Sequence, residues 1–145
     1  MKTIEQLVKD VLRDGFVFHL ATNDANGPWV ASLVYVFDDR LNVYWVSKPT
    51  SRHSLAIAAN PKVACTIVAD HATDKERALQ IEGTAAALTG PSLEREQMLQ
   101  EKRGMPTSSQ PGEILKGSDQ WYELMPTRIE LIHNELFGYE RQRFL

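Results

Sequence analysis

The residues with the clearest chemical potential in this chain are Ser51, Arg52 and His53. Ser51 suits a helix N-cap, because its side-chain oxygen can accept hydrogen bonds from the N–H groups of the first turn. Arg52 and His53 then lie in that turn, where free N–H groups and the helix dipole favour an anion. The pattern therefore indicates either a phosphate site or an ordinary helix cap beside solvated side chains.

The elements that must position these residues are two apolar strands and the short helix between them. The pattern predicts a strand over Leu41–Ser47, a helix over Ser51–Ala59 and a strand over Lys62–Ala69. Asn60-Pro61 ends the helix, because proline disfavours helical geometry at the residue before it.

The rest of the chain alternates short strands with tight turns. Helical spacing of apolar residues predicts a helix over Thr3–Arg13. Strands are predicted over Phe16–Thr22 and Pro28–Phe37, joined by a hairpin turn at positions 23–27, whose residues tolerate positive φ. After these come a predicted strand over Ala78–Leu88, a helix over Leu93–Lys102, a long irregular loop over Met105–Ser118, and two strands, Gln120–Met125 and Arg128–Ile132, bent at Pro126.

The order of these elements predicts a mainly β fold, with six or seven strands and short helices on the outside. Gly83 in the middle of a strand is typical of a bulge or a barrel bend. Antiparallel meanders of this kind build barrels or sandwiches, and the barrel fits this element order best. The tail over 134–145 is either a last strand or a segment that packs on a partner.

Length and composition favour one ordinary globular domain over residues 1–145. The net charge is 16 − 19 = −3, which gives no basic excess for nucleic-acid binding. No apolar run approaches the roughly 20 residues of a membrane-spanning helix. The single cysteine, Cys65, lies in an apolar strand, where a buried and inert thiol is expected. With no secretory core at the start, a cytoplasmic location is expected.

Metal binding and acid–base catalysis find little support in the sequence. His19, His71 and His133 lack the convergent spacing of a metal site. No general acid or base can be identified, so no catalytic residue is assigned. The three tryptophans are each expected in the core or at an interface, with Trp121 the one that could also stack on a flat cofactor.

Four features together resemble the FMN-binding split-barrel superfamily typified by pyridoxamine 5′-phosphate oxidase, from about Phe16 to Ile132. They are the strand pair Pro28–Phe37 and Leu41–Ser47; Ser47-x-x-x-Ser51-Arg52-His53 before Asn60-Pro61; Ile81-Glu82-Gly83-Thr84-Ala85; and Trp121-Tyr122-Glu123-Leu124 before Pro126 and Ile129-Glu130-Leu131. The resemblance implies an antiparallel split β-barrel. It also implies a homodimer with FMN at the subunit interface.

The resemblance also assigns candidate cofactor-binding residues. It implies that Ser47, Ser51, Arg52 and His53 hold the flavin phosphate, and that the strand backbone at Ala31, Ser32 and Leu33 runs past the isoalloxazine and ribityl groups. Val46 precedes the phosphate-binding hydroxyl, and Trp121 is the candidate for stacking on the ring.

The chain departs from the family pattern at several positions. His53 replaces the usual lysine, Ala78 stands where the oxidase has a flavin-contacting glutamine, and the late tryptophan is replaced around Ile132-His133. The arginines that hold pyridoxal phosphate are not recognisable, which argues against vitamin B6 oxidation.

The leading hypothesis is an FMN-dependent oxidoreductase that acts on a small molecule. The alternatives are a non-enzymatic flavin or haem carrier, such as a stress-response protein, and a dimeric barrel that has lost its cofactor.

Overall fold

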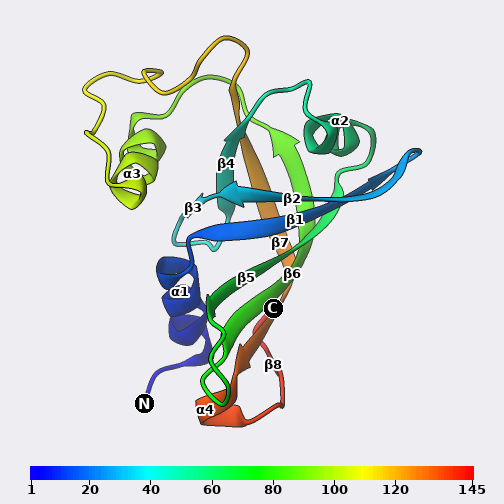
Figure 1. The fold of residues 1–145 in the computed structure, drawn as a ribbon, viewed down its shortest axis with the longest axis vertical. Coiled ribbons are helices and arrows are strands. Elements are labelled where there is room, and N and C mark those ends of the chain that lie inside the picture. Colours follow the sequence, from blue (N-terminus) through cyan, green and yellow to red (C-terminus); the bar gives the residue numbers. More distant parts are fainter.

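The computed structural model describes residues 1–145 and shows a curled antiparallel sheet flanked by helices (Figure 1). Strand makes up 41% of the chain and helix 23%. The elements in chain order are α1 (Ile4–Asp14), β1 (Val17–Asp24), β2 (Gly27–Val34), β3 (Val36–Phe37), β4 (Val43–Ser47), α2 (Arg52–Ala59), β5 (Lys62–Asp70), β6 (Arg77–Ala87), α3 (Leu93–Arg103), β7 (Gln120–His133), α4 (Asn134–Phe137) and β8 (Gln142–Arg143).

The sheet has the strand order β2-β1-β5-β6-β7-β4-β3, with β8 paired to β7 and every pairing antiparallel. The prediction of a mainly β split barrel with short flanking helices is confirmed. The seven strands of the path agree with the predicted six or seven, and the two-residue strand β8 is additional. Strands distant in sequence, β4 and β7, thus become neighbours, which places Ser47 opposite Gln120.

Helix α1 begins where the sequence indicates. Thr3 caps it, and the side chains of Thr3 and Gln6 each accept a hydrogen bond from the other's backbone N–H. One face of the helix buries Val8, Val11 and Leu12 against the sheet. Gly15 follows at a close approach, because a Cβ there would lie 2.6 Å from the Tyr35 hydroxyl.

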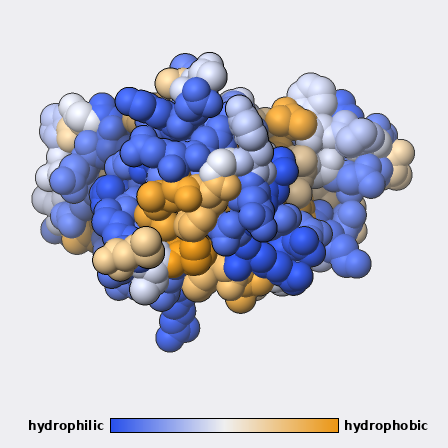
Figure 2. All heavy atoms as spheres, turned by 90° about the horizontal axis from the view of Figure 1, so that it is seen from below, coloured by the Kyte–Doolittle hydropathy of each residue, from blue (hydrophilic) through white to orange (hydrophobic).

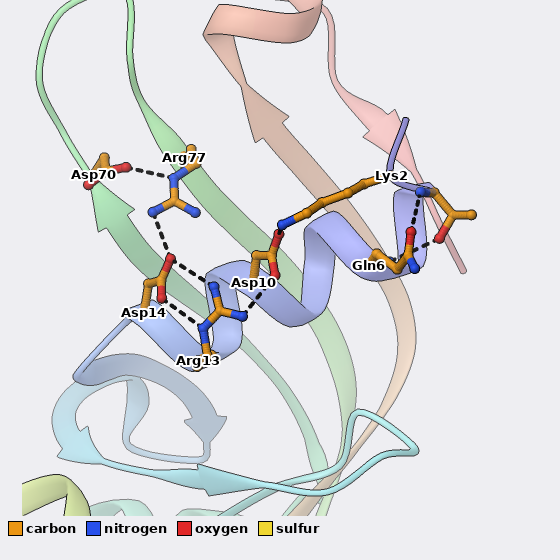
Figure 3. A network of polar contacts seen from close by, with 8 residues as sticks. Lys2, Gln6, Asp10, Arg13, Asp14, Asp70 and Arg77 are labelled. Carbon is orange, nitrogen blue, oxygen red and sulfur yellow. Dashed lines mark hydrogen bonds and ion pairs between the residues drawn. The ribbon is translucent and has the colours of Figure 1, made fainter.

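Polar contacts fix the C-terminal end of α1 to the sheet (Figure 3). Arg77 on β6 donates to Asp70 on β5 at 2.6 Å and to Asp14 of α1 at 2.9 Å. Arg13 in turn contacts Asp10 and Asp14, both at 3.0 Å. The guanidinium of Arg77 therefore joins the adjacent strands β5 and β6 to α1, which is distant from them in sequence.

Two strand predictions were wrong in detail. The strand expected over Pro28–Phe37 is interrupted at Tyr35, whose ring is buried and whose hydroxyl donates to the Leu12 carbonyl at 2.6 Å. The two strands expected on either side of Pro126 are one continuous strand, β7. A register shift between Glu82 and Gly83 on β6 absorbs the irregularity, so that the missing N–H of Pro126 does not break the strand.

The tail forms the short helix α4 and then strand β8, which pairs Arg143 with Glu130. Of the two expectations for the tail, a last strand or a segment that packs on a partner, the structure shows the strand. None of the helices has the length and apolar character that crossing a membrane requires. Seen from below, the molecule carries an area of hydrophobic residues surrounded by hydrophilic ones (Figure 2).

Candidate functional site

The candidate site begins where β4 ends and α2 starts. The turn between them is closed by the backbone N–H and the hydroxyl of Ser51, which both donate to the Lys48 carbonyl, at 3.1 and 2.9 Å. Ser51 is extended, with φ −65° and ψ 153°, and its side chain accepts from the Ser54 N–H. Ser51 is therefore the N-cap, as the sequence predicts.

This local geometry brings three of the predicted phosphate-binding side chains together. His53 Nε2 lies 2.8 Å from Ser47 Oγ and 3.2 Å from Ser51 Oγ. We call these residues the Ser47–Ser51–His53 cluster. The backbone N–H groups of Arg52 and His53 have no acceptor within the chain. Hydroxyl, imidazole and free N–H donors thus gather at one helix start, which is the donor set that a phosphate group requires.

His53 is half-buried, and this burial lowers the pKa of its imidazole from the usual 6.5. No carboxylate forms an ion pair with it. At neutral pH the ring is therefore mainly uncharged, and it donates one hydrogen bond rather than two.

Arg52 lies apart from the cluster. Its guanidinium donates to the Asn26 carbonyl at 3.3 Å and stacks over the Trp29 ring, 4.2 Å from the centroid. No hydrogen bond joins it to Ser47, Ser51 or His53. The side chain therefore fastens α2 to the β1–β2 hairpin and does not contact the other three predicted phosphate-binding side chains.

Beside the cluster is a cleft of about 680 Å³, which we call the β2–α3 cleft. One side is formed by Ser32, Leu33 and Val34 of β2 and by Val46, Ser47 and Lys48 at the end of β4. The cleft therefore contains four of the predicted cofactor-binding residues, namely Ser32, Leu33, Val46 and Ser47. Ser47 belongs both to this lining and to the cluster, so the cluster adjoins the cleft.

The cleft lining does not include the other predicted cofactor-binding residues, which are Ala31, Ser51, Arg52, His53 and Trp121. Trp121 is fully buried in a small core with Val36, Tyr44 and Leu99. The Arg95 guanidinium covers its ring at 5.4 Å from the centroid. Val34, Val46 and Ile114 line the cleft and pack against this small core, so Trp121 supports the cleft lining from the interior.

The opposite side of the cleft comes from residues that the sequence reasoning missed. They are Leu99, Gln100 and Arg103 of α3, and Met105, Glu113, Ile114, Lys116 and Asp119 of the segment that follows. The one sequence signal was the length of the 105–118 loop, since long loops in compact domains tend to be functional. Helices α2 and α3 lie on opposite sides of β4 (Figure 1).

A second cleft of about 500 Å³ lies on the strands β1, β2, β5, β6 and β7. Its lining includes His19, whose Nδ1 lies 2.9 Å from the hydroxyl of Ser32. We call it the His19 cleft. Cys65 also contributes to it; its thiol is buried, as expected, and burial raises the pKa of the thiol to about 12.

Comparisons with solved structures show the same fold at low sequence identity. A conserved hypothetical protein of Mycobacterium tuberculosis is 16% identical with a TM-score of 0.80, over 100% of this chain and 93% of that one. An F420 reductase is 20% identical with a TM-score of 0.66, over 83% and 94%. The haem storage protein HutZ of Vibrio cholerae is 19% identical with a TM-score of 0.68, over 91% and 95%.

A search of curated protein sequences found no match. The family model described as pyridoxamine 5′-phosphate oxidase, in contrast, matches residues 4–133. That range contains the Ser47–Ser51–His53 cluster and both sides of the β2–α3 cleft. The chain therefore belongs to the pyridoxamine 5′-phosphate oxidase family.

Proposed function

We propose that this protein binds FMN in the β2–α3 cleft and serves as an oxidoreductase for a small molecule. The observation that carries the proposal is the Ser47–Ser51–His53 cluster, because its donors converge beside a cleft large enough for a flavin. The residues fit the group: hydroxyls, an imidazole and two free N–H groups suit the phosphate, and Leu33, Val46 and Ile114 give the cleft an apolar lining for the ring.

When bound, FMN supplies the redox chemistry, and the protein supplies binding, orientation and exclusion of water. The cluster holds the phosphate end. The strand backbone at Ala31–Leu33 offers hydrogen bonds to the polar edge of the ring, and the apolar side chains shield it from solvent. No side chain is assigned as an acid or a base, and the F420 reductase of similar fold makes electron transfer the natural reaction class.

The proposal includes a homodimer in the cytoplasm. Trp29, Val30 and Val68 expose apolar side chains on β2 and β5, and a second copy would cover such a surface. The test is sedimentation of the flavin-loaded protein. A folded monomer that retains FMN after dilution would contradict the homodimer. It would not contradict the binding of FMN in the β2–α3 cleft.

The first test of the cofactor is an absorption spectrum of the purified protein, followed by titration with FMN. A yellow protein that oxidises a reduced nicotinamide supports the enzyme, whereas a yellow but inert protein supports a flavin carrier. Colourless protein that fails to bind added FMN would show that the barrel has lost its cofactor.

His53→Ala is expected to weaken FMN binding by about 1.5–3 kcal/mol, the usual loss for a hydrogen bond to a charged group. The measurement is fluorescence titration, since free flavin fluorescence changes on binding. His71→Ala is the matched control, because His71 is exposed in the β5–β6 loop and should leave the affinity unchanged. Equal affinities for the two variants would remove the cluster from the phosphate site.

FMN affinity is expected to rise as the pH falls toward the lowered pKa of His53 in the free protein. Burial keeps the pKa of His53 low in the free protein, and a phosphate beside it would raise that pKa, so binding takes up a proton. When binding takes up one proton, the FMN affinity changes by at most about tenfold per pH unit. The rise in affinity ends near pH 6, where the phosphate itself gains a proton. His53→Gln should flatten the profile, and an unchanged slope would contradict the assignment.

A second candidate function is haem binding in the His19 cleft. The observation that favours it is an exposed imidazole beside a cleft of about 500 Å³, and the structural neighbour from Vibrio cholerae is described as a haem storage protein. Addition of haemin would then give a shifted Soret band that His19→Ala removes. A Soret band that is identical in the two proteins would exclude His19 as an iron ligand.

A further inference from the structure

A half-buried lysine amine lies between α1 and α3. Lys102 is in the last turn of α3, and its Nζ donates to the Tyr35 carbonyl at 2.7 Å. The same nitrogen lies 3.4 Å from the centroid of the Tyr35 ring. It forms no other hydrogen bond and no ion pair. Lysine side chains are rarely buried without a carboxylate partner, so this amine is unusual in the molecule.

Tyr35 holds the amine in one place. Its side chain is fully buried, and its hydroxyl donates to the Leu12 carbonyl at 2.6 Å. Its ring meets the Phe18 ring edge to face, at 5.8 Å between centroids. The ring and the carbonyl that contact Lys102 therefore both belong to a residue that is fixed by the core. An amine that is already positioned has little freedom left to lose when it reacts.

The amine borders a cleft of about 320 Å³, which we call the Lys102 cleft. Its lining is mainly apolar and consists of Leu12, Arg13, Tyr35, Val36, Phe37, Met98, Glu101 and Lys102. The volume is at the lower end of the range for small-molecule sites. The cleft therefore suits a small ligand with an apolar body.

The Lys102 cleft is separate from the β2–α3 cleft. The two share no lining residue. Helix α3 contributes a different set to each of them: Met98, Glu101 and Lys102 to the first, and Leu99, Gln100 and Arg103 to the second. The proposed FMN site therefore gives Lys102 no role.

The surroundings of the amine favour its uncharged form. Burial lowers the pKa of Lys102 to about 8. The other charged residues of the lining do not oppose this, because Glu101 forms no ion pair with Lys102, and Arg13 is paired with Asp10 and Asp14. At pH 7 about a tenth of such an amine is uncharged, against less than about one part in a thousand of an ordinary lysine. Only the uncharged amine can attack a carbon atom.

We propose that Lys102 is a nucleophilic amine that captures small apolar aldehydes as imines in the Lys102 cleft. The nitrogen lone pair attacks the carbonyl carbon, a C–N bond forms, and the carbonyl oxygen takes up a proton that the nitrogen loses. The C–O bond then breaks, the oxygen leaves as water with the second proton of the nitrogen, and the C=N bond forms. The step needs no oxidant or reductant. The apolar lining receives the body of the aldehyde and keeps water away from the imine.

The first test treats the native protein with benzaldehyde at pH 7 in the presence of sodium cyanoborohydride, which reduces the imine to a stable secondary amine. Mass spectrometry of the peptides then gives the rate of modification at each lysine. Lys62 is the internal control, because it is exposed on β5 and forms no ion pair. Lys102 is expected to react at least about tenfold faster than Lys62. An equal or lower rate at Lys102 overturns the proposal.

Recognition by the cleft is tested with a second aldehyde, glycolaldehyde, which has no apolar body. The ratio of the Lys102 rate to the Lys62 rate cancels the intrinsic reactivity of each aldehyde. This ratio is expected to be at least about threefold larger for benzaldehyde, because only benzaldehyde buries a ring against the apolar lining. An equal ratio for the two aldehydes would show that the cleft does not select the ligand, which contradicts the proposal.

The charge state of the amine is tested with 1-fluoro-2,4-dinitrobenzene, a neutral reagent that couples irreversibly to uncharged amines. The rate at Lys102 is expected to reach half of its maximum near pH 8, whereas the rate at Lys62 should still be rising at about pH 10. Coincident pH profiles for the two lysines would refute an activated amine at position 102.

Two variants check the assignment on the intact protein. Lys102→Arg keeps a cation and an N–H donor beside Tyr35 but forms no imine, so limiting benzaldehyde and cyanoborohydride should no longer add one benzyl group per chain. Lys62→Arg is the matched control and should keep that addition. Retention of the benzyl group in Lys102→Arg would assign the reaction to another amine and overturn the proposal.

Added FMN separates this inference from the cofactor proposal. Because the two clefts share no lining residue, FMN should leave the rate at Lys102 unchanged. Protection of Lys102 by FMN would place the amine in the cofactor site and overturn a separate aldehyde site. If the protein does not bind FMN but Lys102 still reacts faster than Lys62, the cofactor proposal fails and the capture of aldehydes stands.

Discussion

Trp45→Ala is expected to lower the free energy of unfolding by about 3–5 kcal/mol, the usual cost of emptying a buried aromatic site. Trp45 is fully buried on β4. Its ring stacks on Tyr122 at 5.7 Å between centroids and meets Phe18 at 5.2 Å. These contacts join β4 to β7 and to β1, so the cavity would open in the core that supports the candidate site.

The measurement is urea unfolding followed by far-UV circular dichroism, which does not depend on the lost tryptophan. Trp29→Ala is the matched control, because Trp29 is 43% exposed and packs chiefly under the Arg52 guanidinium. We expect that control to cost about 1 kcal/mol or less. Similar losses for the two variants would contradict the view that the Trp45 ring is central to the core.

Gly83→Ala should destabilise the fold by about 1–3 kcal/mol, the usual range for an added methyl group in a packed region. A Cβ at this position would collide with the Met125 carbonyl and lie 2.9 Å from Leu124 Cδ2. The obstacle is mainly backbone, which cannot rotate aside as a side chain can. The clash therefore falls on the pairing of β6 with β7, at the register shift beside Pro126.

A change in this register would also alter the candidate site, because β7 pairs with β4 and places Gln120 opposite Ser47. We expect Gly83→Ala to weaken FMN binding as well as stability. Thr84→Ala, the next position on β6, is the control and should have a much smaller effect on both. Stability of Gly83→Ala equal to that of the native chain would show that the strands part there without cost.

The two variants together test the route by which the core shapes the site. Trp45→Ala removes packing between strands and leaves their pairing intact, whereas Gly83→Ala disturbs the pairing and leaves the core side chains in place. Comparison of FMN affinity at equal stability, reached by adding urea to the less affected variant, would show which of the two matters more for the cluster.

The sequence by itself determined the features that depend on neighbouring residues. The capping of α1 by Thr3 and of α2 by Ser51 follows from side chains that reach the first turn of their own helix. The hairpin at positions 23–27 and the end of α2 at Asn60 follow from turn chemistry and from proline. The convergence of Ser47, Ser51 and His53 belongs here too, because one tight turn is enough to bring them together.

The tertiary structure alone decided the features that depend on distant partners. Arg52 lies on the β1–β2 hairpin because Trp29 and the Asn26 carbonyl are brought there by the sheet. Strand β7 runs through Pro126 because the pairing of β6 with β7 shifts register there and leaves Thr127 of β7 without a partner. The loop that closes the cleft is fixed by Glu96 through N–H groups more than fifteen residues away in sequence. Local sequence patterns do not predict such contacts, because the contacts contribute free energy only when the folded chain brings the distant partners together.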